Sequence, residues 1–156
     1  MKTIRNIFEI EFKNLYAIEK QTCEIVDRIR YIFNDRNTEK RFQKFISNAQ
    51  KSKDDIQAYL AEQKINPGST TDSVMQEMLQ NIVDITNKRI NKDVKEIGLL
   101  CSLNRATHYK IACYKNVRTL AKQLGIENID KEIKTIRKTN SKEAKKIKAS
   151  TVKSID

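Results

Sequence analysis

Glycine and proline are scarce in this chain, whose 156 residues include three glycines and one proline. The abundant residues are Glu, Lys, Arg, Gln, Leu, Ile and Ala, which lose little conformational freedom in a helix. With so few chain breakers, the composition indicates helix throughout. The length suits one domain, because it is enough to bury a core without disulfides or a structural metal.

Cysteine is also rare. The three cysteines, Cys23, Cys101 and Cys113, include no CxxC spacing, and their odd number argues against a disulfide framework and for reduced thiols. No apolar run has the length that a bilayer crossing requires, and the first residues show no signal-peptide hydrophobic region. We therefore expect a cytoplasmic protein without membrane attachment.

The first half of the chain contains two long amphipathic segments. Apolar residues at spacings of three and four predict one helix over residues 3–34 and a second that begins with Asn37 as its cap. The short connection makes these helices an antiparallel pair. Asn66, Pro67 and Gly68 form the strongest breaker in the chain, and the second helix is expected to end there.

The second half shows a short helical segment followed by another long pair. Residues 72–89 predict a crossover helix, Asn91 can cap the next helix, Gly125 can end it, and the last helix begins near Asn128. Two long antiparallel pairs joined by such a crossover predict an all-α, ferritin-like four-helix bundle. We expect a single domain over 1–150 and a flexible basic tail over 151–156.

Several polar residues fall on the stripes that should face the core. Glu19 lies beside the apolar face of the first helix, where it could also reach solvent as a boundary residue. On the fourth helix, Thr107 and Lys110 fall on the core side. His108 is the only histidine, and a lone histidine is more often a hydrogen-bonded packing residue than a ligand. We treat these four positions as one candidate interior polar cluster, which Asn48, Gln50, Ser52 and Lys53 of the second helix could join.

Three runs, residues 14–21, 105–114 and 120–125, resemble the YciF-type ferritin-like stress proteins, a family of largely unknown function. The resemblance extends over roughly residues 7–145. It implies a di-metal site rich in carboxylates inside the bundle. Where that family reads Glu-His-Tyr-Glu, this chain has Thr107-His108-Tyr109-Lys110, while Glu19 is kept. The second helix offers only Asn48, Ala49 and Gln50 in place of the family's acidic face, and residues 135–140 of the last helix contain no acid.

The remaining donors do not suit a pair of hard cations, which require several anionic oxygen ligands. A charged lysine has no lone pair with which to coordinate a metal. We therefore expect a degenerate metal site with no bound cofactor, in which Glu19 and Lys110 pair. A residual single-metal site at Glu19 and His108 is the alternative.

The C-terminal part of the chain is strongly basic and contains no aromatic residue after Tyr114. Lysines and arginines of the last helix could contact phosphates, although a solvated helix face is the favoured explanation. Without aromatic residues, base stacking is not available, so any nucleic-acid binding should be weak and non-specific. The candidate contact residues are Arg137, Lys138, Lys142, Lys145, Lys146 and Lys148.

The common catalytic motifs are absent: the chain has no GxGxxG, P-loop, HExxH or GxSxG sequence. We expect a non-catalytic, stress-associated bundle protein, not an enzyme, and no small-molecule substrate is evident. A homodimer is expected, because long amphipathic helices often leave an apolar strip to share. The alternative is a basic accessory protein that binds nucleic acid or acidic partners through its C-terminal helix.

Overall fold

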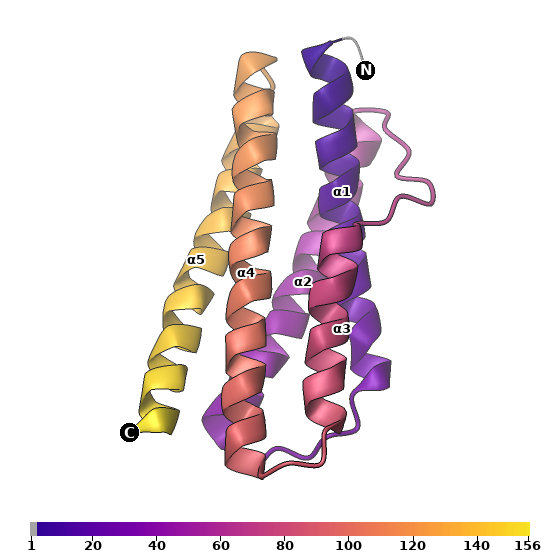
Figure 1. Cartoon of the computed structure of the whole chain (residues 1–156). Helices are drawn as coiled ribbons and strands as arrows, with labels where there is room; N and C mark the ends of the chain where they lie inside the picture. The colour runs from indigo at the N-terminus through magenta and orange to yellow at the C-terminus, as the bar shows by residue number, and fades with distance from the viewer. Residues whose placement is uncertain (1–2) are drawn as a thin grey trace.

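The computed structural model describes residues 3–156. Within this range the chain contains helices and no strand, which confirms the predicted all-α fold class (Figure 1). The elements in chain order are α1 (Ile4–Glu24), the short 3₁₀ helix η1 (Ile25–Arg28), α2 (Arg36–Glu62), α3 (Ser73–Asn87), α4 (Lys92–Gln123) and α5 (Glu127–Ile155).

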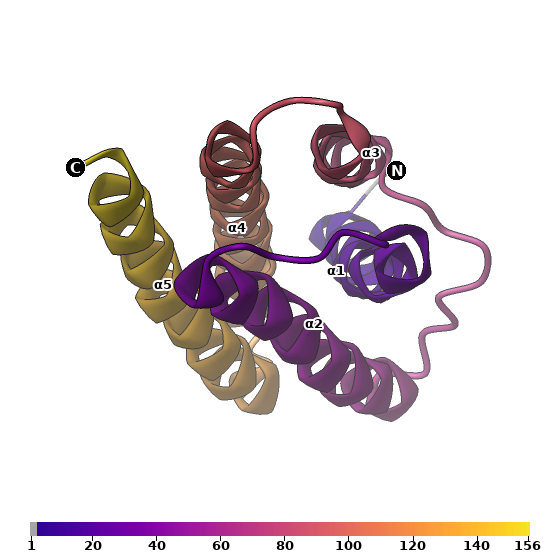
Figure 2. The ribbon, with the colours of Figure 1, turned by 90° about the horizontal axis from the view of Figure 1, so that it is seen from below.

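The four long helices form two antiparallel pairs, α1 with α2 and α4 with α5. The connection from α2 to α4 returns along the outside of the bundle, and α3 occupies its second half (Figure 1). As a result α2 and α4 run in the same direction. Figure 2, which looks along the bundle, shows α3 beside α1 and α4, with α5 on the far side of α4. This is the connectivity predicted for a ferritin-like bundle.

The core is built from apolar stripes on all five helices. Phe8, Phe12, Leu15 and Ile18 of α1 are fully buried, as is Tyr114 of α4. Fully burying a side chain such as Leu or Phe contributes about 1.5–3 kcal/mol. Apolar packing is therefore the main stabilising term, and the few buried charges stand out against it.

The first helix ends ten residues earlier than predicted. It ends at Glu24, passes through η1 and continues as extended chain to Asp35. From Ile29 to Asn34 the side chains alternate between half-buried and exposed, as they do in an extended segment. The carboxylate of Glu96 on α4 accepts hydrogen bonds from the backbone N–H groups of Asn34 and Asp35, at 2.8 and 3.1 Å. This contact fixes residues 29–35, an extended strap that crosses the end of the bundle.

The boundaries of the other helices agree with the sequence in part. Asn91 caps α4 as predicted, and Gly125 has the expected positive φ of 69° after α4. The cap of α2 is Asp35, whose carboxylate accepts from Thr38 N–H at 2.8 Å, so the assignment of Asn37 is wrong. Asn37 instead donates to the Ser150 hydroxyl on α5 at 2.9 Å.

The C-terminal helix is longer than expected. It begins at Glu127 and stays helical to Ile155, so most of the segment 151–156, expected to be a flexible tail, extends α5. Across residues 3–156, none of the helices combines the length and the apolar character that crossing a membrane requires.

Candidate functional site

Three helices bring polar side chains together inside the bundle. On α1, Glu19 follows Phe12 and Leu15 along the buried stripe, and on α4, Lys110 lies between Thr107 and Tyr114 on the same kind of stripe. Glu19 and Lys110 are each 1% exposed. Lys110 Nζ lies 2.9 Å from Glu19 Oε1, so the predicted ion pair is present. Ser52 of α2 is the third contributor.

The surroundings of this pair are of low polarity. Lys110 Nζ lies 4.5 Å from the centre of the Phe45 ring, within the range of a cation–π contact. Neither Glu19 Oε1 nor the Tyr114 hydroxyl has a partner with full hydrogen-bond geometry among residues 3–156. The attraction between Lys110 and Glu19 is therefore chiefly Coulombic, and it acts where water does not weaken it.

Burial and charge act in opposite directions on the carboxyl group. Desolvation by burial raises the pKa of Glu19, and the neighbouring Lys110 ammonium lowers it, with smaller lowering contributions from the hydroxyls of Ser52 and Tyr114. Burial and the nearby Glu19 charge both raise the pKa of Tyr114, which keeps its phenol neutral.

A di-metal centre does not fit these residues. Lys110 places an ammonium 2.9 Å from the carboxylate that the resemblance implies as a ligand. Ser52 and Thr107 are neutral and add no charge to balance a hard cation. Among the residues that the structure describes, no group of three or more His, Cys, Asp or Glu side chains could hold a metal ion.

The interior position predicted for His108 is wrong. His108 is exposed and lines a groove between α4 and α5, together with Cys101 and Arg105. One residue along a helix is a rotation of about 100°, which takes His108 away from the stripe of Thr107 and Lys110. Glu19 and His108 therefore do not share a site, and the alternative of a single metal between them is wrong.

The second helix contributes less than its sequence suggested. Ser52 is buried in the polar layer, whereas Gln50 is exposed and Asn48 and Lys53 are half-buried. Of the four candidate positions named on α4 and α1, Glu19, Thr107 and Lys110 are interior.

A second buried ion pair joins α2 to α5. Nη1 of Arg41 lies 2.8 and 3.0 Å from the two carboxylate oxygens of Glu143, and both side chains are buried. Burial raises the pKa of Glu143, and Arg41 is the main influence that lowers it. Sequence reasoning missed this pair. Its signal was a lone acid on the buried stripe of an otherwise lysine-rich helix, between Asn140 and Ile147.

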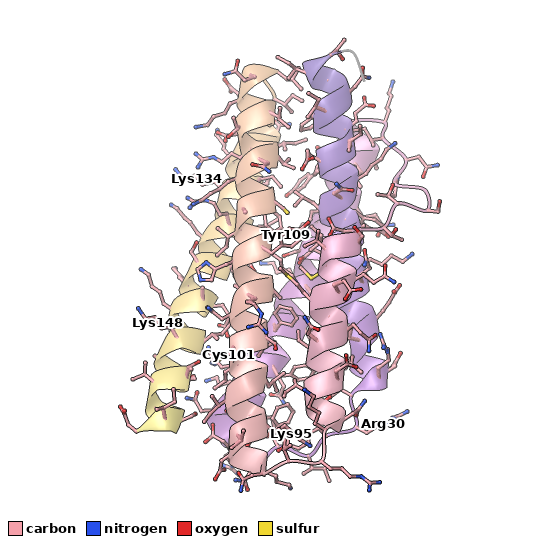
Figure 3. All side chains as sticks on the ribbon, viewed as in Figure 1. Arg30, Lys95, Cys101, Tyr109, Lys134 and Lys148 are labelled. Carbon is pink, nitrogen blue, oxygen red and sulfur yellow. The ribbon has the colours of Figure 1, made fainter. Side chains whose placement is uncertain are left out.

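A third polar contact ties α4 to the start of α3. The Tyr109 hydroxyl donates to the Asp72 carboxylate, whose oxygens lie 2.8 and 3.0 Å away. The same carboxylate caps α3 by accepting from Met75 N–H at 2.7 Å. Desolvation and the bond to Asp72 both raise the pKa of Tyr109. Figure 3 shows Tyr109 on the side of α4 that faces α3.

The outer surface of α4 and α5 is basic. No acidic residue occurs between Ile97 and Ile126, and Glu143, the single acid between Ile133 and Ile155, is buried against Arg41. Of the candidate phosphate contacts, five are exposed and Arg137 is half-buried. The exposed five are Lys138, Lys142, Lys145, Lys146 and Lys148.

Comparisons with known proteins place this architecture in a family. A family model described as a domain of unknown function, DUF892, matches residues 3–156. Protein YciF of Escherichia coli is 22% identical over 135 residues, which cover 86% of this chain and 81% of that protein. The crystal structure of the Escherichia coli stress protein YciF has a TM-score of 0.92 at 18% identity, covering 99% of this chain and 98% of that one.

A second solved structure has the same fold. YcfI of Rhodopseudomonas palustris, named as a candidate structural protein, has a TM-score of 0.83 at 14% identity, and the match covers 95% of this chain and 94% of that one. These likenesses agree with the predicted YciF-type resemblance and with the bundle described above.

Proposed function

The chain belongs to the DUF892 family, and from that premise we propose that it is a non-catalytic, stress-associated bundle protein that has lost the di-metal site. In this proposal the ion pair of Glu19 and Lys110 takes the place of metal and ligands. The stress association comes from the description of YciF as a stress protein. A structural role agrees with the description of YcfI.

One observation carries this proposal. The ammonium of Lys110 lies 2.9 Å from Glu19 and is sealed from solvent, so the carboxylate already has its counter-charge. A divalent cation would have to displace a buried ammonium that shares the space and repels it. The charge of Glu19 is then balanced inside the bundle by Lys110, without a metal ion.

Metal analysis of the purified protein tests the proposal. The wild-type chain and Glu19→Gln are produced without chelators in medium that contains iron, manganese and zinc, and their metal content is measured after gel filtration. We expect less than about one tenth of a metal ion per chain in both, since among residues 3–156 no group of three or more His, Cys, Asp or Glu side chains could hold a metal ion. Near-stoichiometric metal that is present in the wild type and lost in Glu19→Gln would overturn the proposal.

The alternative function is weak, non-specific binding of nucleic acid by α5. The exposed lysines from Lys138 to Lys148 support it. Deleting the helix is a poor test, because Ile133 and Ile147 belong to the core. Gel shifts with the full-length variant Lys138→Glu/Lys142→Glu are preferable. Binding should fall steeply with added salt and weaken in this variant, and salt-independent binding would contradict the alternative.

A further inference from the structure

A groove of about 680 Å³ runs between α4 and α5 on the outer face of the bundle. The two helices diverge toward the C-terminus of α5, as both ribbon views show (Figures 1 and 2). Figure 3 places Cys101 of α4 and Lys148 of α5 at about the same level of the two helices. The α4 residues that line the groove extend from Cys101 to Lys115, about 21 Å at 1.5 Å per residue.

The floor and the rims of this groove differ in character. Ile111 and Ala144 are the buried lining side chains and Val152, which is 50% exposed, adds further apolar surface, so the floor is mainly apolar. Half-buried polar side chains also line the groove, namely Asn104, Ser141 and Thr151. Arg105 and Lys115 form the rim on α4, and the rim on α5 consists of Lys145 and Lys148. Among the described residues that line the groove there is no acidic side chain, and the imidazole of His108 is the one aromatic ring.

We propose that this groove between α4 and α5 docks an acidic amphipathic helix of a partner protein. Such a helix has an apolar stripe with acidic residues on both sides, which matches an apolar floor between two basic rims. About 14 residues of helix would fill the groove from end to end. The interaction is separate from the interior of the bundle, so it does not depend on whether the metal site has been lost.

The same features make nucleic acid a poorer occupant of the groove. A phosphate backbone gains from the basic rims but not from an apolar floor, and the single imidazole of His108 offers the bases little stacking surface. An amphipathic helix uses both the floor and the rims. The apolar floor therefore distinguishes the two occupants. Val152 is the position at which they can be separated, because it is 50% exposed and its substitution should not disturb the core.

The experiment uses a synthetic fluorescent peptide of 16 residues with leucines at helical i, i+3, i+4, i+7 spacing and glutamates on both flanks. A scrambled peptide of the same composition has no apolar stripe, and a DNA duplex serves as the nucleic-acid probe. Binding to the full-length protein is measured by fluorescence anisotropy at moderate salt. We expect the amphipathic peptide to bind at least about tenfold more tightly than its scrambled isomer, since only the former covers the floor.

Two variants and a charge-matched control locate the site. Lys145→Glu/Lys148→Glu reverses the α5 rim and should weaken the amphipathic peptide about tenfold or more. Lys20→Glu/Lys51→Glu makes the same change in net charge at exposed positions of α1 and α2 and should leave binding within about twofold. Val152→Lys should weaken the peptide while leaving duplex binding equal or stronger, because it adds positive charge and removes apolar floor.

The result that supports the proposal is tight binding of the amphipathic peptide that is lost in Lys145→Glu/Lys148→Glu and Val152→Lys and kept in the control. Equal binding of the two peptides, equal losses in rim and control variants, or binding of the duplex alone would each overturn it. All of the substituted residues are exposed, so circular dichroism should show the helical content of the wild type in every variant.

Discussion

The ammonium of Lys110 lies 2.9 Å from the carboxylate of Glu19, and each of these two residues is 1% exposed. Two opposite charges so deeply buried contribute little net stability, because desolvation offsets most of their attraction. Their mutual dependence is large, however, since removing one leaves the other uncompensated. The pair should therefore be detected by the coupling energy between substitutions of its two members, more than by the stability of the wild type.

Single and double substitutions should show that coupling directly. Glu19→Gln and Lys110→Met each strand a buried charge and should lower the free energy of unfolding by roughly 3–5 kcal/mol. The double variant should lose clearly less than the sum of the two. Urea unfolding of the four proteins gives the coupling energy. Additive effects would show that the two side chains do not depend on each other.

The pH dependence of Lys110→Met should carry the signature of Glu19. Burial raises the pKa of Glu19 and the ammonium lowers it, so removing Lys110 raises that pKa further. When the pKa is higher in the folded than in the unfolded state, the folded protein binds more protons, and stability falls as pH rises from the unfolded toward the folded pKa. Lys110→Met should therefore be destabilised less at pH 5 than at pH 8, relative to the wild type.

Urea unfolding at the two pH values measures this effect. The matched control is Glu19→Gln/Lys110→Met, which has no carboxyl group to protonate at this position. The difference in unfolding free energy between this double variant and Lys110→Met should change between pH 5 and pH 8, because only Lys110→Met keeps the carboxyl group of Glu19. If Lys110→Met and the double variant follow parallel curves, the carboxyl group of Glu19 is not the titrating group.

The sequence predicted the interior stripes better than the position of single residues around them. Glu19 and Lys110 were placed correctly because each lies in a long run of residues at three- and four-residue spacing, which fixes the buried face. His108 was placed by its neighbours in a resembling motif, and a 100° step per residue is enough to move it to the surface. A motif match therefore identified the helix but not the direction of this side chain.

Tertiary contacts explain what the pattern could not supply. Residues 29–34 fit helical spacing, yet they form an extended strap because Glu96, far along the chain, accepts from the backbone of Asn34 and Asp35. The pair of Arg41 and Glu143 joins residues 102 positions apart, and no local pattern predicts such a partner. The groove between α4 and α5 likewise depends on how two helices diverge.

The buried pair of Arg41 and Glu143 should be far more sensitive than a surface pair. Arg41→Met leaves the Glu143 carboxylate buried without its partner and should cost roughly 3–5 kcal/mol. Arg5 and Glu9 form the matched control, since their contact is 2.9 Å but their side chains are 38% and 35% exposed. Glu9→Gln should cost less than about 1 kcal/mol. Thermal or urea unfolding compares them, and equal losses would contradict the assignment of a buried pair.

The sequence predicts a homodimer, and exposed apolar residues on α1 provide a way to test it. Ile4, Ile7 and Ile10 are 49%, 37% and 40% exposed near the start of α1. If this apolar surface is shared by two copies, sedimentation should give a mass near twice 18.2 kDa. Ile7→Lys/Ile10→Lys should then shift the protein to the monomer, whereas Ile90→Lys, at an exposed position in the connection before α4, should not. A monomer at all concentrations would remove the prediction.

The contact between Tyr109 and Asp72 should stabilise the junction of α3 and α4. Tyr109→Phe removes a donor from a buried carboxylate and should cost about 1.5–3 kcal/mol, the range for hydrogen bonds to charged groups. Asp72→Ala should cost more, because it also removes the cap of α3. Since both substitutions break one contact, their combined effect should be smaller than the sum.

Tyr16→Phe is the matched control, because Tyr16 is half-buried on α1 and its hydroxyl makes no hydrogen bond within residues 3–156. It should change the free energy of unfolding by less than about 0.5 kcal/mol. The pH dependence gives an independent measurement. Desolvation and Asp72 raise the pKa of Tyr109 in the folded protein, so this residue makes stability fall as pH rises above about 10, the ordinary value for tyrosine. The loss of unfolding free energy at alkaline pH should be smaller in Tyr109→Phe than in Tyr16→Phe. Identical losses in the two variants would show that Asp72 does not keep the Tyr109 hydroxyl protonated.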